Sequence, residues 1–291
     1  MLTTLFICDR LLGATLDLNV RATLIAIIPI FIFGLWDDYK NISPPLKLTS
    51  QIAAALILIR MGVYIKIFES PDFFIYGQGP SYIYLDWLLT IFWVVGVTNA
   101  FNFVDSMDGL AVGLGGMAAA FFMLVTLDSQ QPLLSLHSTV VLGICFGLYF
   151  YNAPPAQLFL GDSGAQSLGL IMAVLAIGYS PRDAYQTSSW FIPILLLGVP
   201  IFDAVLVVLS RLRRRQPVYT AALDHTYHRL LRLGLDSNRA VLTMHFTALL
   251  LSSLAFVLLG QSPLVANFTF VLLALAGCWA LAFLDSKKVW L

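Results

Sequence analysis

The chain has 291 residues, of which 59% are hydrophobic and only 11% are charged, and its formal net charge is zero. This composition excludes an ordinary soluble domain, which needs far more charge to cover its surface, and it offers no basic patch for nucleic acid. The three cysteines lie apart in apolar runs, so neither a disulfide framework nor a zinc site is supported; they are Cys8, Cys145 and Cys278.

Apolar stretches recur along the whole chain, and each predicts a membrane-spanning helix, because lipid offers no partner to unpaired backbone polar groups. The nine stretches cover 20–36, 48–66, 85–104, 110–127, 135–152, 166–180, 188–209, 239–260 and 263–284. We therefore expect an all-α, polytopic integral membrane protein of about nine transmembrane helices. No internal repeat or linker interrupts the pattern, so residues 1–291 are predicted to form a single membrane-embedded domain.

The loop between the second and third stretches differs from the others. Two short runs rich in aromatic and β-branched residues, VYIKIF and YIYL, flank the turn-forming segments SPD and GQGPS. This pattern predicts a small hairpin around 67–84 at the outer membrane interface.

The distribution of lysine and arginine over the loops predicts which helix ends face the cytoplasm. One set of loops holds most of these basic residues, namely 37–47, 105–109, 153–165, 210–238 and the C-terminal tail. Such an excess marks the cytoplasmic side. The same loops contain nearly all of the acidic, amide and histidine residues of the four polar motifs, although only lysine and arginine were used to assign the cytoplasmic side. We therefore expect one site at the cytoplasmic face.

The first polar motif is WDDYKNISPPLKLTSQ, in which Asp37 and Asp38 end one stretch and Lys47 opens the next. Adjacent carboxylates at a membrane boundary are costly unless they are solvated or paired with a cation, although a solvated helix end is the simpler interpretation. The two prolines before Lys47 are typical of a helix start, and a lysine there could reach a phosphate.

The second motif is NAFNFVDSMDG, whose polar residues are spaced three apart, at Asn99, Asn102, Asp105 and Asp108. One such step keeps two side chains on one helix face, but four steps wind half-way round. The helix is therefore expected to end near Asp105 and to turn through Gly109. The motif predicts a lip of amides and carboxylates at the membrane surface, and a polar helix end with Asx turns is the alternative.

The third motif is YNAPPAQLFLGDSGAQSLG, in which Asn152 closes a stretch and Asp162 opens the next helix beside Gly161. An aspartate at a helix start is most often an N-cap. A glycine-flanked aspartate can also approach a diphosphate closely and hold a hard cation. The sequence alone leaves both interpretations open.

The fourth motif is RLRRRQPVYTAALDHTYHRLLRLG, which places His225 and His228 among arginines in the longest cytoplasmic loop. The pattern HxxH could be half of a zinc site, but no third ligand is near in sequence, so contact with an anionic substrate is favoured. Asp203 lies inside an apolar stretch and needs a partner, which Arg211, two turns on, or a neighbouring polar helix could supply.

In this order the four motifs, spread over residues 37–234, resemble those of the polyprenyl-phosphate N-acetylhexosamine-1-phosphate transferase family. The resemblance implies transfer of a sugar-1-phosphate from a UDP-sugar to polyprenyl (undecaprenyl) phosphate with release of UMP, as the first lipid-linked step of a cell-envelope glycan. It also implies Mg²⁺, which Mn²⁺ could replace, and a multi-pass protein of the inner (plasma) membrane with a cytoplasmic active site. A homodimer stays open, and no nucleic-acid partner is implied.

Carried over residue by residue, the resemblance assigns the catalytic acidic pair to Asp37 and Asp38 and the Mg²⁺ ligands to Asn102 and Asp162. One aspartate of the pair could deprotonate the lipid phosphate, or a carboxylate could form a covalent intermediate. The other polar or matched positions are expected to bind substrate, and they are Lys47, Asn99, Asp105, Asp108, Asn152, Phe159, His225 and His228.

The segment HTYHRLLRLG is similar to the pattern HxHHRLLxxG of the GlcNAc-1-phosphate branch, which favours UDP-GlcNAc as the donor. The MurNAc-pentapeptide branch has a run of adjacent histidines instead. Three residues depart from the family pattern, since Tyr227, Ser106 and Ala165 stand where it has histidine, glycine and serine. The N-terminal helices of the family have no counterpart in this sequence, and we expect a shortened or incomplete enzyme rather than an inactive one.

Three other functions compete with this one. The first is phospho-MurNAc-pentapeptide transfer to the same lipid. The second is a transporter, because an intramembrane aspartate and broken helices can mark an ion path, although the acidic residues gather at one face rather than at the bilayer midplane. The third is a non-catalytic membrane scaffold derived from the enzyme.

Overall fold

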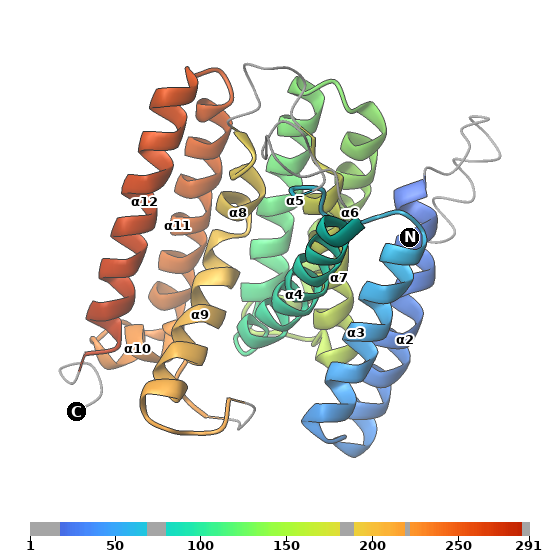
Figure 1. Ribbon diagram of the computed structural model, residues 1–291. Helices are drawn as coiled ribbons and strands as arrows, with labels where there is room; N and C mark the ends of the chain where they lie inside the picture. The colour runs from blue at the N-terminus through green and yellow to red at the C-terminus, as the bar shows by residue number, and fades with distance from the viewer. Residues whose placement is uncertain (1–17, 69–79, 181–188, 219–221, 287–291) are drawn as a thin grey trace. The chain divides into compact units, whose positions relative to one another are not determined.

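The structure is a computed structural model that describes residues 18–68, 80–180, 189–218 and 222–286. Its regular secondary structure consists of helices α2 to α12, and no strand occurs in these ranges (Figure 1). The predicted all-α, polytopic class is therefore confirmed. The helices form two compact units, which are described separately, and the single domain stays a prediction.

The first unit comprises Met1–Asn99 and Leu160–Gly178. Helix α2 packs against both α3 and α7 in this unit. Gly34 permits the contact with α7, because a Cβ at this position would lie only 2.5 Å from the Cα atom of Ser163. The helices of the unit are α2 (Leu18–Lys40), α3 (Pro44–Arg60), most of α4 (Pro80–Val104) and α7 (Gly161–Gly178).

The second unit comprises Ala100–Phe159 and Tyr179–Leu291. Helix α11 lies against α5, α8, α9 and α10, while α5 packs along α6 and α12 contacts α9. Beyond the end of α4, the helices of this unit are α5 (Leu110–Asp128), α6 (Pro132–Asn152), α8 (Ile192–Leu196), α9 (Gly198–Arg213), α10 (Thr226–Arg232), α11 (Ser237–Leu258) and α12 (Pro263–Leu284).

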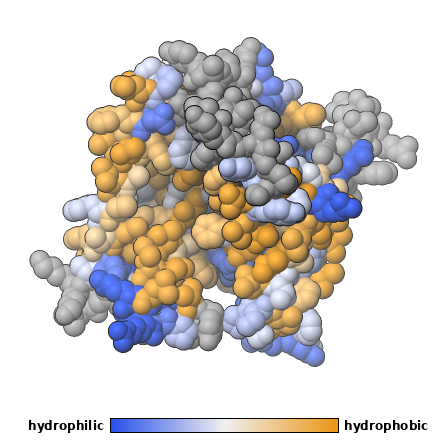
Figure 2. All heavy atoms as spheres, viewed as in Figure 1, coloured by the Kyte–Doolittle hydropathy of each residue, from blue (hydrophilic) through white to orange (hydrophobic). Residues whose placement is uncertain are grey.

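Seven helices of the described residues are long and apolar enough to cross a membrane, namely α2, α4, α5, α6, α7, α11 and α12. The stretch predicted at 48–66 is the shorter helix α3, and the stretch at 188–209 is broken into α8 and α9. Large apolar side chains on α12, such as Leu264 and Trp279, are mostly exposed. Figure 2 shows hydrophobic residues along the sides of α11 and α12 and hydrophilic ones at the end near α10, as a lipid-facing surface requires.

The predicted outer hairpin is wrong where the structure describes it. The run YIYL lies inside α4, and the run VYIKIF has no regular structure. Buried Asp86 of α4 accepts hydrogen bonds from the backbone N–H groups of Ile67 (3.0 Å) and Phe68 (2.9 Å). The backbone N–H groups of these two residues are thus bound by a side chain. Residues 69–79 lie outside the described ranges.

Candidate functional site

Asp37, Lys47 and Asp162 meet in the first unit. Pro44 and Pro45 begin α3, as predicted, and this start brings Lys47 back toward the last turn of α2. The Lys47 Nζ atom lies 2.5 Å from Asp37 Oδ2 and 2.8 Å from Asp162 Oδ2. Asp37 is buried, and its other oxygen accepts a hydrogen bond from the Ile42 N–H. One ammonium group thus bridges two carboxylates.

Asp38 binds the start of α7 rather than Lys47, the partner of Asp37. Its Oδ1 atom accepts a hydrogen bond from the Asp162 N–H (2.7 Å), and its Oδ2 atom accepts from the N–H and the hydroxyl of Ser163. These groups open α7, so an aspartate on α2 caps the N-terminus of another helix. Gly161, at φ +63°, must be glycine here, because a Cβ would lie 2.8 Å from the Asp38 carboxylate. The N–H groups of Asp162 and Ser163 at the start of α7 are therefore capped by Asp38.

Asn99 belongs to a chain of amides in the first unit. Its Nδ2 atom donates to Gln51 Oε1 at 2.6 Å, and Gln51 Nε2 donates to Gln166 Oε1 at 2.9 Å. Gln166 Nε2 in turn donates to Asp162 Oδ2 at 3.0 Å. Asn99 was a predicted site residue, whereas Gln51 and Gln166 were not. Their signal was an amide inside a predicted membrane-spanning stretch, which lipid makes costly.

The second motif ends α4 at Val104 and turns through Gly109 at φ +74°, as predicted. In the second unit, Asp108 Oδ2 accepts a hydrogen bond from the Ala156 N–H (3.0 Å). Buried Asn152 accepts from the Gly109 N–H (3.2 Å) and donates to the Leu158 carbonyl (2.8 Å). Two distant loops are held together by these bonds. Asn102 and Asp105 lie at the end of α4 and just after it, and Phe159 is 70% exposed.

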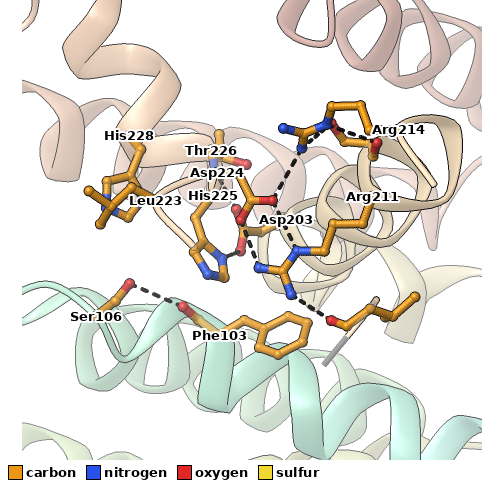
Figure 3. Close-up of polar contacts among 12 residues, drawn as sticks. Phe103, Ser106, Asp203, Arg211, Arg214, Leu223, Asp224, His225, Thr226 and His228 are labelled. Atoms are coloured by element: carbon orange, nitrogen blue, oxygen red, sulfur yellow. Dashed lines mark hydrogen bonds and ion pairs between the residues drawn. The ribbon is translucent and has the colours of Figure 1, made fainter. Parts of the chain in front are cut away.

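The histidine segment also lies in the second unit (Figure 3). Asp203 is completely buried in α9, and its carboxylate accepts from His225 Nδ1 (2.9 Å) and from the Thr226 N–H (2.5 Å). The ring of Phe103 lies edge-on to His225, 5.5 Å between centroids. The suggested pairing of Asp203 with Arg211 is wrong, because the histidine loop folds back onto α9 and its residues His225 and Thr226 bind the Asp203 carboxylate instead.

Arg211 instead forms a two-pronged ion pair with Asp224, the residue before His225, with N–O distances of 2.9 and 2.7 Å. Arg229 of α10 is fully buried and donates to the Leu284 carbonyl (2.8 Å) and to Asp285 Oδ1 (3.1 Å) at the end of α12. These ion pairs fix the histidine loop to α9 and α12. The motifs did not predict these ion pairs, because they join residues 13 and 56 positions apart that only the folded chain brings together.

The sequence of the chain is similar to those of known proteins. A sequence model described as glycosyl transferase family 4 matches residues 20–180, which is more than half of the chain. This chain belongs to glycosyl transferase family 4. The matched segment contains the first three motifs and ends before the histidine segment.

Three relatives indicate where the chain stands within glycosyl transferase family 4. The probable undecaprenyl-phosphate N-acetylglucosaminyl 1-phosphate transferase of Bacillus subtilis (strain 168) is 30% identical over 84% of this chain and 68% of that protein. The decaprenyl-phosphate N-acetylglucosaminephosphotransferase of Mycobacterium leprae (strain TN) is 32% identical over 80% and 63%. The phospho-N-acetylmuramoyl-pentapeptide-transferase of Rubrobacter xylanophilus is 27% identical over 77% and 71%. The chain thus spans about two thirds of the length of these relatives.

The oxygen donors of this family 4 protein fit a hard cation. No group of three or more His, Cys, Asp or Glu side chains able to hold a metal ion occurs among the described residues. In the first unit the carboxylates of Asp37 and Asp162 both form ion pairs with Lys47. Mg²⁺ takes few protein oxygens and completes its shell with water and phosphate, so a single carboxylate such as that of Asp162 is a donor that would suit it. Asn102 lies in the other unit, and its pairing with Asp162 stays a prediction.

His228 gives the family 4 protein a pH-dependent stability. Its Nε2 atom is 2.7 Å from the hydroxyl of Tyr227, the residue that replaces the family's middle histidine. Burial, aided by repulsion from His225, lowers the pKa of His228 from 6.5 to about 4. Burial alone would raise the pKa of Asp224, but hydrogen bonding and charge from Arg211 outweigh it and hold this pKa below 3.8.

We therefore expect the free energy of unfolding to fall as the pH drops from 6.5 toward about 4, because the unfolded chain then binds the His228 proton that the folded chain does not. The stabilisation from Asp224 persists across that window and is lost only at lower pH. Thermal unfolding of the detergent-solubilised protein should show a shallower acid-side fall in His228→Gln than in the wild type. His137→Gln, in α6, is the control. Equal slopes for His228→Gln and the wild type would contradict the assignment.

Proposed function

We propose that this protein transfers N-acetylglucosamine-1-phosphate from UDP-N-acetylglucosamine to a polyprenyl phosphate, such as undecaprenyl phosphate, and releases UMP. Membership of glycosyl transferase family 4 and two relatives that carry such names support the proposal. The observation that carries it is the cluster in which Lys47 bridges Asp37 and Asp162. In such a cluster a substrate phosphate can replace a carboxylate as the partner of Lys47, and a metal ion can replace Lys47 as the partner of a carboxylate.

The reaction joins two phosphates. An oxygen of the lipid phosphate attacks the sugar-bearing phosphorus of the donor, a new P–O–P linkage forms, and the bond to UMP breaks with its electron pair leaving on UMP. We assign Asp37 as the acceptor of the proton that a protonated lipid phosphate carries. Lys47 is assigned to the lipid phosphate as a point charge, which it can reach by turning from Asp37. Positioning and charge neutralisation supply most of the catalysis in such a transfer.

The remaining roles are those that the resemblance to the family implies for these positions. Mg²⁺, for which Asp162 and Asn102 are the proposed ligands, would neutralise charge on the diphosphate when bound. His225, oriented by Asp203, and His228 are assigned to the diphosphate, because imidazoles beside arginines suit an anion. For the uridine group we assign Asp108, Asn152 and Phe159.

The test is an incubation of membranes with labelled UDP-GlcNAc, polyprenyl phosphate and Mg²⁺, with detection of labelled lipid and of UMP. The expected result is a lipid-linked product that forms only with both substrates and stops in a chelator. Release of UMP from the donor alone would instead indicate a covalent sugar-phosphate intermediate. No product from a well-expressed protein would overturn the proposed function.

A second donor is favoured by one observation, the 27% identity with the phospho-N-acetylmuramoyl-pentapeptide-transferase of Rubrobacter xylanophilus. The same incubation with UDP-MurNAc-pentapeptide separates the two. The single pair of histidines in HTYHRLLRLG supports GlcNAc, so we expect product from UDP-GlcNAc and little from the pentapeptide donor.

The protein is a multi-pass membrane protein, and we propose that it resides in the inner membrane with its site facing the cytoplasm, because of the lysine and arginine excess on those loops. A cysteine introduced at Gln216 should therefore resist a membrane-impermeant thiol reagent in intact cells and react after the cells are opened. A cysteine at Gly77, which lies outside the described residues, should react in both. Labelling of position 216 in intact cells would reverse the topology.

A further inference from the structure

The amides of Asn99, Gln51 and Gln166 form a relay that ends on the carboxylate of Asp162. Gln51 and Gln166 are 1% and 2% exposed, so water does not compete for these hydrogen bonds. Asn99 and Gln51 pair reciprocally, each donating to the carbonyl oxygen of the other, at 2.6 and 3.2 Å. Gln51 then donates to Gln166, and Gln166 donates to Asp162. Three helices, α4, α3 and α7, each contribute one amide.

The two ends of the relay fix its direction. Asn99 Nδ2 also donates to the Val95 carbonyl at 2.8 Å, and this oxygen can only accept. At the other end the ionised carboxylate of Asp162 can only accept as well. Every amide between them must therefore point its NH₂ group one way. Turning any single amide round would set two oxygens or two NH₂ groups face to face in a buried place, which is costly.

We propose that Gln51, Gln166 and Asn99 are positioning residues that hold the carboxylate of Asp162 in the orientation for binding a divalent cation. This inference rests on the proposed function, in which Asp162 is a cation ligand. It assigns a role to two glutamines that lie in the first and third motifs but were not predicted to belong to the site, and it moves Asn99 from substrate contact to support of the cation ligand Asp162. Partners that orient a ligand typically change cation affinity or activity by about 10–100-fold when removed.

The relay predicts an effect at a distance. In Gln51→Glu the shape is retained, but an ionised carboxylate at position 51 can only accept, so Gln166 must turn its NH₂ group toward it. The Gln166 carbonyl oxygen then faces Asp162 Oδ2 and repels it. Gln166→Leu removes the same donor directly. The two changes should therefore not add, because both act by the loss of one hydrogen bond to Asp162.

The experiment measures Mn²⁺ binding to the purified, detergent-solubilised protein by electron paramagnetic resonance, alongside product formation in the assay above. We expect each single variant to weaken Mn²⁺ binding by about 10-fold and the double variant to be no weaker than either. Thr98→Val is the matched control. Its buried hydroxyl, beside Asn99 on α4, makes no hydrogen bond within the described residues, so binding should be unchanged.

Each outcome bears on the inference. Wild-type affinity in both single variants, additive losses in the double variant, or no Mn²⁺ binding by the wild-type protein would each overturn the relay. If Gln166→Leu does not fold, Gln51→Glu still decides by the direction of the change, since the added negative charge alone would strengthen Mn²⁺ binding, whereas loss of the hydrogen bond to Asp162 weakens it. Failure of the proposed function has a separate signature, namely absence of labelled lipid from a wild-type protein that binds Mn²⁺ normally.

Discussion

The substitution Asp37→Asn should lower turnover by at least ~10²-fold, the usual scale for loss of a positioned proton acceptor. Asp37 is buried, and its Oδ2 atom lies 2.5 Å from the Lys47 ammonium, so its charge and its basicity both depend on this contact. An amide of the same shape keeps the packing but accepts no proton. The measurement is steady-state turnover with both substrates in membranes where expression is matched.

Asp38→Asn is the internal comparison for this experiment. Asp38 binds the first N–H groups of α7, and an amide can still accept one of those hydrogen bonds. We expect a smaller loss of turnover, with reduced thermal stability as the main effect. Near-wild-type turnover in both variants would remove the acidic pair from the mechanism and leave it as a helix end and a cap.

Asp162→Ala should abolish Mg²⁺-dependent turnover, with a loss of at least ~10²-fold, because a metal supplies several kcal/mol of charge stabilisation. The carboxylate accepts hydrogen bonds from Lys47 and Gln166, whereas the first N–H groups of α7 are bound by Asp38. Its removal should therefore leave α7 capped by Asp38 and the protein folded. Turnover is measured as a function of Mg²⁺ concentration.

Asp128→Ala, at the end of α5, controls for loss of a carboxylate elsewhere and should retain its turnover. If Asp162→Ala also turns over normally at limiting Mg²⁺, Asp162 has no role in cation binding. The proposed mechanism would then lose its metal ligand in the first unit.

The sequence predicted those features that depend on neighbouring residues. Helix boundaries at Pro44, Gly109 and Asn152 follow from the chemistry of proline, glycine and asparagine at chain turns. The gathering of Asp37, Lys47 and Asp162 was anticipated from the motifs rather than from physics alone. The break between α8 and α9 was not predicted, although Pro193 lies before it and Gly198 and Pro200 lie after it.

Features that depend on distant residues could not be predicted. The predicted outer hairpin is wrong because the run YIYL belongs to α4, where Asp86 accepts hydrogen bonds from the N–H groups of Ile67 and Phe68. Of the two partners suggested for Asp203, Arg211 is wrong and a neighbouring polar helix is right, because the chain returns to α9 after an intervening loop and the start of α10 makes the contact. Gln51 and Gln166 were missed because three helices must pack before their amides meet, and hydrophobic patterning carries no information about that contact.

Helix glycines are common targets when a membrane protein is engineered for purification, since replacement by alanine relieves about 0.5–1 kcal/mol of backbone entropy cost. Gly143 and Gly147 of α6 have room for a methyl group, because nothing lies within 4 Å of the added carbon. Gly34 does not, since α2 and α7 would be driven apart at Ser163. It stands one turn before Asp38, so the same change would draw that carboxylate away from the amides it caps. A thermostabilised variant must therefore retain glycine at position 34.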